Sequence, residues 1–190
     1  MGNREDLLAG ARKALLERGL AKVTARDIAA AAGVSLAAIG YHFGSKDRLI
    51  SEAVTMSTGS QIGDGIDAAI RDAGEGHSLW ESLGPTWNGM FDVVQNYHEQ
   101  LMLSLENATN IIRSPESQAF MADAVEGAYA GLIQTLREVY PELSADRARA
   151  VGKLYLALFQ GMAMHWLLAP ASDPLTGDDV ELAVKTLRGK

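Results

Sequence analysis

Side chains that can donate hydrogen bonds to phosphate oxygens gather in a short stretch near the N-terminus. Thr24 and Ser35 carry hydroxyl groups, Tyr41 a phenol, His42 a ring nitrogen and Lys46 an ammonium group. Donors of these kinds bind the sugar-phosphate backbone of DNA and orient a protein on it without reading its sequence. The stretch therefore indicates a nucleic-acid contact. As an alternative, the two hydroxyls serve only as helix caps, and His42 and Lys46 are ordinary packing or surface residues.

The sequence around these donors, TARDIAAAAGVSLAAIGYHFGSKDRLI at residues 24–50, predicts two short helices joined by a tight turn. Thr24, with Asp27 three residues later, has the pattern of a capping box at the start of one helix. Gly33 supplies the backbone freedom for the turn, and Ser35 is placed to cap the helix that follows. This is the layout of a helix-turn-helix, in which the second of the two helices lies in the major groove of DNA.

The residues that this groove-lying helix would present to the bases are small or apolar. They are Leu36, Ala37, Ala38 and Gly40. An alanine can contact a thymine methyl group, but it cannot make the bidentate hydrogen bonds that read a base directly. We therefore expect discrimination to depend on Arg26, on close backbone approach at Gly40 and on DNA shape.

Beyond this stretch the sequence predicts an all-α protein. Apolar residues recur at helical spacing, there are only five prolines, and runs of β-branched residues are few. The expected helices span residues 4–18, 46–72, 85–97, 98–113, 116–139, 145–169 and 178–188. We expect an N-terminal three-helix helix-turn-helix DNA-binding domain over residues 1–48. The helix at 46–72 would connect it to a larger helical ligand-binding and dimerisation domain over residues 49–190.

Charge is distributed unevenly along the 190 residues. The net charge is −7, but residues 1–50 hold eight Lys or Arg and five Asp or Glu, giving +3, whereas residues 51–190 hold nine and nineteen, giving −10. A basic head on an acidic body suits a protein that turns only its head toward phosphates. The chain has no cysteine and no apolar run of the roughly 20 residues that span a bilayer. We therefore expect a soluble, cytoplasmic protein without a membrane partner.

The sequence contains no recognisable pattern of catalytic or metal-binding residues. The four histidines are scattered without the spacing of metal ligands, and the sequence has no phosphate-binding loop, dinucleotide-binding glycine pattern or nucleophile elbow. It therefore predicts no enzyme activity, no catalytic residue, no metal site and no cofactor. A helical module whose head binds protein instead of DNA remains the alternative from another class.

Two helices of the body have faces on which another helix could pack closely. The helix at 145–169 has small residues at spacings of seven and four, and the last helix has an apolar face. The residues expected at such an interface are Ala150, Ala157, Gly161, Val180, Val184 and Leu187. Two helices from each subunit would form the four-helix interface of a homodimer, unless they pack only within one subunit.

Aromatic and methionine side chains concentrate in the body, as they do in pockets for apolar ligands. The residues expected to line a pocket are Trp87, Phe91, Met102 and Phe159, with Asn107 and Asn110 as polar contacts. The same side chains could equally form an ordinary core. If the pocket exists, its ligand is mainly apolar.

Taken together, the motif closely resembles the N-terminal domain of the TetR (tetracycline repressor) family of bacterial regulators. The residues that fill the family pattern are Thr24, Arg26, Ile28, Ala29, Ala32, Gly33, Val34, Ser35, Tyr41, His42, Phe43, Ser45, Lys46 and Leu49. The late run QGMAMHWLLAP is also similar to the corresponding helix of the family.

This resemblance implies an all-helical homodimer with a DNA-binding head and a ligand-binding, dimerising body. It also implies binding to a palindromic operator, usually to repress transcription, and release of the DNA by a small molecule. An activator with the same head is the alternative within the family. One position departs from the pattern: many members carry a tyrosine that contacts phosphate where this chain has Gly40.

Overall fold

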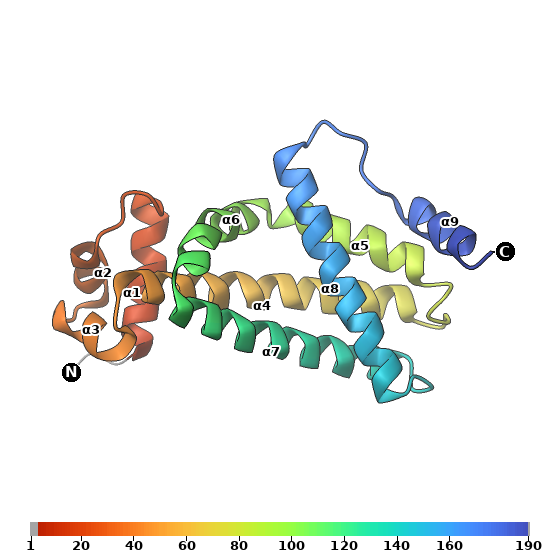
Figure 1. The fold of residues 1–190 in the computed structure, drawn as a ribbon, viewed down its shortest axis with the longest axis horizontal. Coiled ribbons are helices and arrows are strands. Elements are labelled where there is room, and N and C mark those ends of the chain that lie inside the picture. The colour runs from red at the N-terminus through yellow and green to blue at the C-terminus, as the bar shows by residue number, and fades with distance from the viewer. Residues whose placement is uncertain (1–3, 190) are drawn as a thin grey trace. The chain divides into compact units, whose positions relative to one another are not determined.

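A computed structural model describes residues 4–189, and helices are the only regular secondary structure in that range. The helices are α1 (Arg4–Arg18), α2 (Ala25–Ala32), α3 (Ala37–Phe43), α4 (Lys46–Gly74), α5 (Leu83–Asn96), α6 (His98–Arg113), α7 (Pro115–Val139), α8 (Ala145–Leu168) and α9 (Gly177–Leu187) (Figure 1). The all-α prediction is confirmed, and each predicted helix end lies close to the observed one.

The contacts divide the chain into two compact units. One unit contains α1, α2, α3, the first half of α4, nearly all of α6 and the first half of α7. The other contains the second halves of α4 and α7 together with α5, α8 and α9. These units do not coincide with the predicted division after residue 48. That residues 1–48 act as the DNA-binding domain, and residues 49–190 as the ligand-binding and dimerisation domain, stays a prediction.

An apolar core holds α1, α2 and α3 together in the first unit. Leu7, Ile28 and Phe43 are buried in it, one from each helix. Close approach of α1 to α2 requires glycine at one position, because a Cβ atom at Gly10 would lie 2.6 Å from the Cβ of Ala32. The core thereby fixes the orientation of α3, which is too short to be stable alone.

In the second unit, α5 packs against α8 and α9. Met90 of α5, Tyr155 of α8 and Val180 of α9 are all buried. The start of α9 also lies close to α5, since a Cβ atom at Gly177 would be 2.4 Å from the carbonyl oxygen of Gly84. Figure 1 shows α9 beside α5, and this packing sets one boundary of the cleft described below.

Hydroxyl side chains cap the starts of α4 and α8. The backbone N–H of Arg48 donates to Ser45 Oγ at 3.1 Å, and that of Arg147 donates to Ser144 Oγ at 3.3 Å. Such caps satisfy backbone donors that have no partner inside the helix, so they locate the helix start along the chain.

Candidate DNA-binding surface and ligand cleft

A capping box fixes the start of α2. The Thr24 backbone N–H donates to Asp27 Oδ2 at 2.9 Å, and the Asp27 N–H donates to Thr24 Oγ1 at 3.2 Å. Hydrogen bonds from the Thr24 side chain and backbone hold the pKa of Asp27 below its ordinary value. Arg18, at the end of α1, lies 3.1 Å from the other carboxylate oxygen of Asp27. The predicted capping box is therefore confirmed, and it joins α2 to α1.

The turn between α2 and α3 depends on Gly33, whose φ of 66° lies in the left-handed region that favours glycine. The predicted Ser35 cap is wrong: within the described chain no side-chain hydrogen bond caps α3, which begins at Ala37. Instead, the Ser35 carbonyl accepts a hydrogen bond from the backbone N–H of Ala38 at 3.1 Å. The Ser35 hydroxyl is thus not used by the helix start.

The residues predicted to contact DNA come from the start of α2, the turn before α3, α3 itself and the first residue of α4, and most of them are exposed. Those that are exposed are Thr24, Arg26, Ser35, Leu36, Ala37, Gly40 and Tyr41. Those that are half-buried are Ala38, His42 and Lys46. Tyr41 is 85% exposed, and Leu36 is exposed although the neighbouring Ile39 is buried. An exposed leucine and tyrosine on a short helix are available to a partner without disturbing the core.

Lys46, predicted to contact DNA, also makes two contacts within the protein. Its Nζ donates to the Val23 carbonyl at 3.4 Å and lies 3.6 Å from Asp47 Oδ1. The ammonium group therefore helps to fasten the loop before α2 to the start of α4. The long distances leave it able to turn toward a phosphate.

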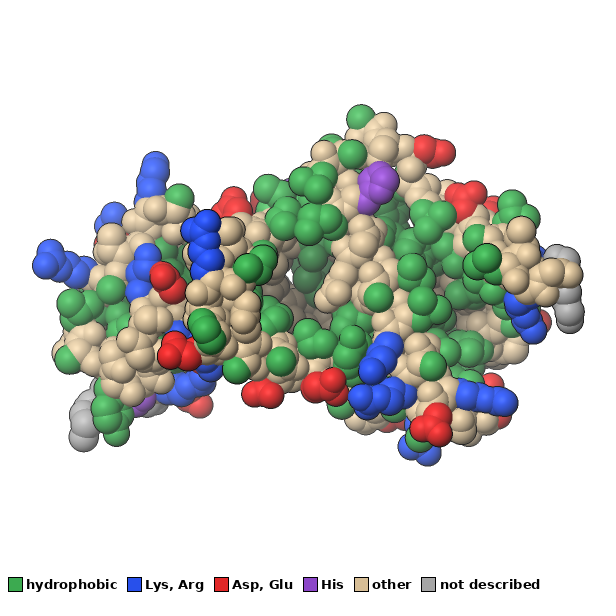
Figure 2. All heavy atoms as spheres, in the orientation of Figure 1, with side chains coloured by type: hydrophobic (Ala, Val, Ile, Leu, Met, Phe, Trp, Pro, Cys, Tyr) green, Lys and Arg blue, Asp and Glu red, His purple; other side chains and the backbone are tan. Residues whose placement is uncertain are grey.

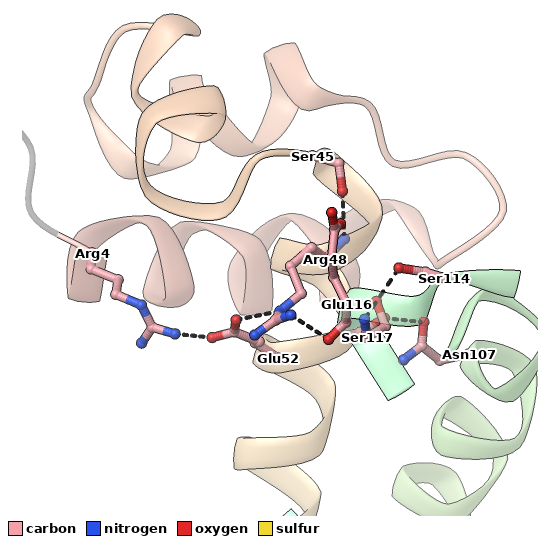
Figure 3. A network of polar contacts seen from close by, with 9 residues as sticks. Arg4, Ser45, Arg48, Glu52, Asn107, Ser114, Glu116 and Ser117 are labelled. Carbon is pink, nitrogen blue, oxygen red and sulfur yellow. Dashed lines mark hydrogen bonds and ion pairs between the residues drawn. The ribbon is translucent and has the colours of Figure 1, made fainter. Parts of the chain in front are cut away.

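A polar network in the same unit connects α1, α4 and α7 (Figure 3). The Glu52 side chain is 3% exposed and accepts hydrogen bonds from Arg4 and from Arg48, the latter at 2.6 Å. Arg48 also donates to the carbonyl oxygen of Glu116 and lies over the Phe120 ring. Because Glu52 already engages Arg48, this arginine is not free for phosphate, although it belongs to the basic head.

Asn107, predicted as a polar contact of the pocket, lies instead beside this network. Its Oδ1 accepts hydrogen bonds from Ser51 Oγ at 3.5 Å and from Asn110 Nδ2 at 3.3 Å (Figure 3 shows the Asn107 contact). Its Nδ2 has no hydrogen-bond partner among the described residues. Both asparagines belong to α6 in the first unit, as does Met102.

A cleft of about 460 Å³ opens in the second unit between α5, α8 and the loop that leads into α9. From α5 it is lined by Trp87 and Phe91. From α8 it is lined by Ala157, Leu158, Gly161, Met162, His165 and Trp166. From the loop and the first turn of α9 it is lined by Ser172, Asp173, Pro174, Leu175 and Asp179. Its size and its aromatic walls are typical of small-molecule sites.

Hydrogen bonds hold the loop wall of the cleft in place. Trp87 Nε1 donates to the Leu175 carbonyl, and His165 Nε2 lies 3.0 Å from Ser172 Oγ. Thr176 and Asp179 form a second capping box at the start of α9. Hydrogen bonds from the Thr176 side chain and backbone keep the pKa of Asp179 below its ordinary value.

Of the six residues predicted for the pocket, Trp87 and Phe91 line the cleft. Met102, Asn107 and Asn110 do not line it, and Phe159 is buried in the core beside it. Sequence reasoning missed the contributions of His165, Trp166 and Asp173. Trp166 is four residues after Met162 on the same helix, so helical spacing could have found it, whereas the loop residues gave no such signal.

The predicted interface residues on α8 belong to a longer exposed stripe. Ala150, Ala157 and Gly161 are exposed, and so are the residues that alternate with them at spacings of three and four. These additional members are Leu154, Met164 and Leu168, at 54%, 44% and 71% exposure. Figure 2 shows hydrophobic side chains over and beside α8 on the face drawn there. A regular apolar stripe of this length on one helix is typical of a surface that packs against a second helix.

The predicted interface residues on α9 are placed differently from one another. Leu187 is 88% exposed and Val184 is half-buried, whereas Val180 is buried within its own chain. We therefore leave Val180 out of the interface proposed below.

Across residues 4–189, no three His, Asp or Glu side chains are grouped so that they could hold a metal ion. No helix in that range is both long enough and apolar enough to cross a membrane.

The chain is similar to known regulators along most of its length. The model of the family described as "Bacterial regulatory proteins, tetR family" matches residues 7–53. The HTH-type transcriptional regulator BetI 2 of Chromohalobacter salexigens is 30% identical over 167 residues, which cover 88% of this chain and 78% of that protein. The HTH-type transcriptional regulator TtgR of Pseudomonas putida is 26% identical, over 92% of this chain and 85% of that protein.

Solved structures share the fold at lower sequence identity. The multidrug binding protein EbrR, complexed with imidazole, has a TM-score of 0.65 at 18% identity, covering 97% of this chain and 93% of that chain. A transcriptional regulator described as putative, from Pseudomonas aeruginosa PAO1, has a TM-score of 0.60 at 22% identity, covering 98% and 90%. The fold therefore recurs in these structures over 97% and 98% of the chain.

Proposed function

Since the chain belongs to the TetR family of bacterial regulatory proteins, we propose that it binds a palindromic operator as a homodimer and represses transcription until a mainly apolar small molecule releases it. Its relatives are transcriptional regulators with a helix-turn-helix DNA-binding domain, and such regulators are not enzymes. The observation that carries the proposal is the exposed surface of α3, which a fully packed core holds outward.

In the proposed complex, α3 lies in the major groove and α2 crosses the backbone. Leu36, Ala37 and Ala38 contact apolar parts of the bases, such as thymine methyl groups. The proposed phosphate contacts come from the hydroxyls of Thr24, Ser35 and Tyr41, from His42 and from Lys46. Arg26 is exposed beside them and reaches either a phosphate or a base edge.

We propose that the dimer forms through the exposed stripe on α8 together with α9. The exposed leucines and methionine of that stripe lie at spacings of three and four from Ala150, Ala157 and Gly161, so a partner helix could pack closely against α8. Ala157 and Gly161 also line the cleft, so the proposed interface would border the proposed effector site. On α9, Leu187 is exposed and Val184 is half-buried, and we propose that these two residues also take part in the interface. A C2 dimer of this kind matches the two-fold symmetry of a palindromic operator.

The cleft between α5 and α8 is the proposed effector site. Its volume of about 460 Å³ and its walls of Trp87, Phe91 and Met162 suit a ligand with a large apolar part. We propose that Trp87 and Phe91 contact that part directly.

A gel shift tests operator binding. At moderate salt, the protein is expected to bind the DNA upstream of its own coding sequence more tightly than random DNA of equal length. Tyr41→Ala removes an exposed side chain, so it is expected to weaken binding about tenfold while leaving the helical content unchanged. Leu16→Ala, at an exposed leucine outside the proposed surface, is the matched control. Equal binding to both DNAs would overturn the proposal.

Sedimentation or light scattering tests the dimer. Leu154→Arg places a charge in the middle of the stripe and is expected to shift the dimer toward monomer. Ile112→Arg changes a leucine-sized exposed residue of α6 in the same way and serves as the control, since Ile112 is 69% exposed and outside the stripe. A dimer that withstands Leu154→Arg as well as it withstands Ile112→Arg would contradict the proposed interface.

A further inference from the structure

The cleft combines aromatic rings with negative charge. Trp87, Phe91 and Trp166 present three aromatic side chains, and Asp173 and Asp179 present two carboxylates. None of the described residues that line the cleft is a lysine or an arginine. An anionic ligand would therefore be repelled by these carboxylates, whereas a cation would be attracted by the aromatic rings and by the opposite charge.

The two carboxylates have different surroundings. Asp179 Oδ2 accepts hydrogen bonds from the backbone and the hydroxyl of Thr176, so it serves the start of α9. Asp173 lies in the preceding loop, and within residues 4–189 its carboxylate has no hydrogen-bond or ion-pair partner. Asp173 is therefore the group whose charge is available to a ligand.

The loop that carries Asp173 is fastened on both sides of that residue. Ser172 hydrogen-bonds to His165 of α8, and its hydroxyl also donates to the Ala169 carbonyl at 2.7 Å. Two residues beyond Asp173, the Leu175 carbonyl accepts the hydrogen bond from Trp87 Nε1. These hydrogen bonds hold the loop that carries Asp173 in the wall of the cleft, so binding a ligand there requires little further ordering of the loop.

The remaining walls are apolar. Leu158 and Met162 line the side of the cleft formed by α8, and their side chains offer neither hydrogen-bond donors nor charge. A ligand that fills the cleft must therefore have an apolar body in addition to its charge. A small inorganic cation would leave most of these walls without contact.

We propose that this cleft binds an amphipathic organic cation, with its apolar body against Trp87, Phe91 and Met162 and its cationic group beside Asp173. The inference rests on the proposed function in one respect, since it names the chemical class of the effector for the same cleft. The aromatic rings contribute through cation–π attraction and Asp173 through its charge. The charge of Asp173 thereby favours a cationic ligand over a neutral one of the same shape, which the apolar walls alone would not distinguish.

Two probes of the same shape separate charge from size. Benzyltrimethylammonium is the cation, and neopentylbenzene is its neutral counterpart with carbon in place of nitrogen. Both are titrated into the full-length protein while tryptophan fluorescence is recorded, because two of the three tryptophans line the cleft. The cation is expected to bind at least about tenfold more tightly than the neutral probe.

Substitution of the acidic residues locates the charge. Asp173→Asn removes the available carboxylate and is expected to lower the affinity for the cation about fivefold, with no loss for the neutral probe. Asp178→Asn removes the same charge from a neighbouring exposed residue that does not line the cleft, and it is expected to leave both affinities unchanged. Equal effects of the two substitutions would show that only overall charge matters and would overturn the proposal.

Other outcomes also decide the matter. Equal affinity for the two probes, or preference for the neutral one, would overturn selection of cations. Failure of both probes to bind would overturn it as well, for example because a partner subunit fills the cleft. A gel shift without ligand keeps the proposed function separate: loss of operator binding with intact cation selectivity would refute the regulator proposal alone. Release of DNA by the neutral probe as readily as by the cation would refute the present inference alone.

Discussion

The surface of α3 and the cleft beside α8 present opposite chemistry to their proposed ligands. The α3 surface offers hydroxyls, a phenol and basic groups. Of the carboxylates near it, Asp27 is bound within a capping box and Asp47 lies 3.6 Å from Lys46 Nζ. The cleft offers aromatic rings and carboxylates, without a lysine or an arginine among its described lining. Polyanionic DNA and an organic cation would therefore each be attracted to one surface and repelled by the other.

The two surfaces also differ in what supports them. The α3 surface rests on a small core whose helices touch at Gly10, where no larger residue fits. The cleft rests on one large residue, Trp87, which fills the core of its unit and fastens the loop wall. We therefore expect that damage to either support can be confined to its own unit.

The largest expected effect is that of Trp87→Ala. Trp87 is 5% exposed, so its truncation leaves a large cavity and removes the hydrogen bond to Leu175, at a cost of about 3–5 kcal/mol. Hydrogen exchange should show lost protection in α5 and α8 and unchanged protection in α1–α3. Trp80→Ala, at a half-buried tryptophan outside the cleft, should cost less. Equal loss of protection in α1–α3 would show that the two regions do not respond independently.

Gly10→Val should have the next largest effect, and in the opposite region. The added side chain would clash with Ala32, so we expect a loss of about 3 kcal/mol in the stability of α1–α3, with loss of DNA binding. Fluorescence should still report probe binding in the cleft. Gly59→Ala is the control, because a Cβ atom there meets nothing within 4 Å and alanine favours the helix. Retained DNA binding by Gly10→Val would contradict the proposed support for α3.

Gly40→Tyr should change affinity more than stability. A Cβ atom at Gly40 meets nothing within 4 Å, so the exposed face of α3 has room for a side chain. A tyrosine there would supply a phosphate contact that this chain lacks, and operator affinity should rise about fivefold in a fluorescence anisotropy titration. Gly40→Phe has the ring without the hydroxyl. If both variants gain equally, a phosphate contact is not the cause.

The smallest expected effect is a loss of stability at low pH, and it tests the capping boxes that both units contain. Both capping boxes hold an aspartate, Asp27 or Asp179, whose pKa is lowered by its threonine partner. Such groups stabilise the fold above their unfolded-state pKa, and the contribution is lost as the pH falls below about 4. Urea midpoints should therefore fall with pH, and less steeply in Thr24→Ala or Thr176→Ala. An unchanged slope in both variants would contradict this role.

The sequence predicted the α3 surface better than the cleft, because the α3 surface comes from one short stretch of the chain. The residues of the α3 surface are consecutive or nearly so, and local signals such as the Thr24 and Asp27 pair and Gly33 position the helices that carry them. Elsewhere, apolar residues at helical spacing predicted helix spans that end close to the observed ones. Ser35 was misassigned because its hydroxyl could serve a cap or a ligand, and spacing does not decide between them.

The cleft could be predicted only in part because three separate segments build it. Trp87 and Phe91 stood out as large aromatic residues four apart, but which walls would face them depends on how α5 packs against α8 and α9. Asn107 and Asn110 looked similarly suited to a ligand, yet α6 belongs to the other unit. Asp173, in a loop without periodicity, gave no signal that it would line the cleft.

A DNase footprint over the DNA upstream of the coding sequence tests the central claim most directly, with and without benzyltrimethylammonium. The account predicts one protected stretch with two symmetric halves whose centres lie about 10 base pairs, or a multiple of that, apart. It also predicts that protection disappears as the cation fills the cleft. Absence of any protected stretch at protein concentrations that saturate specific operators, or protection of a single asymmetric site, would contradict the account.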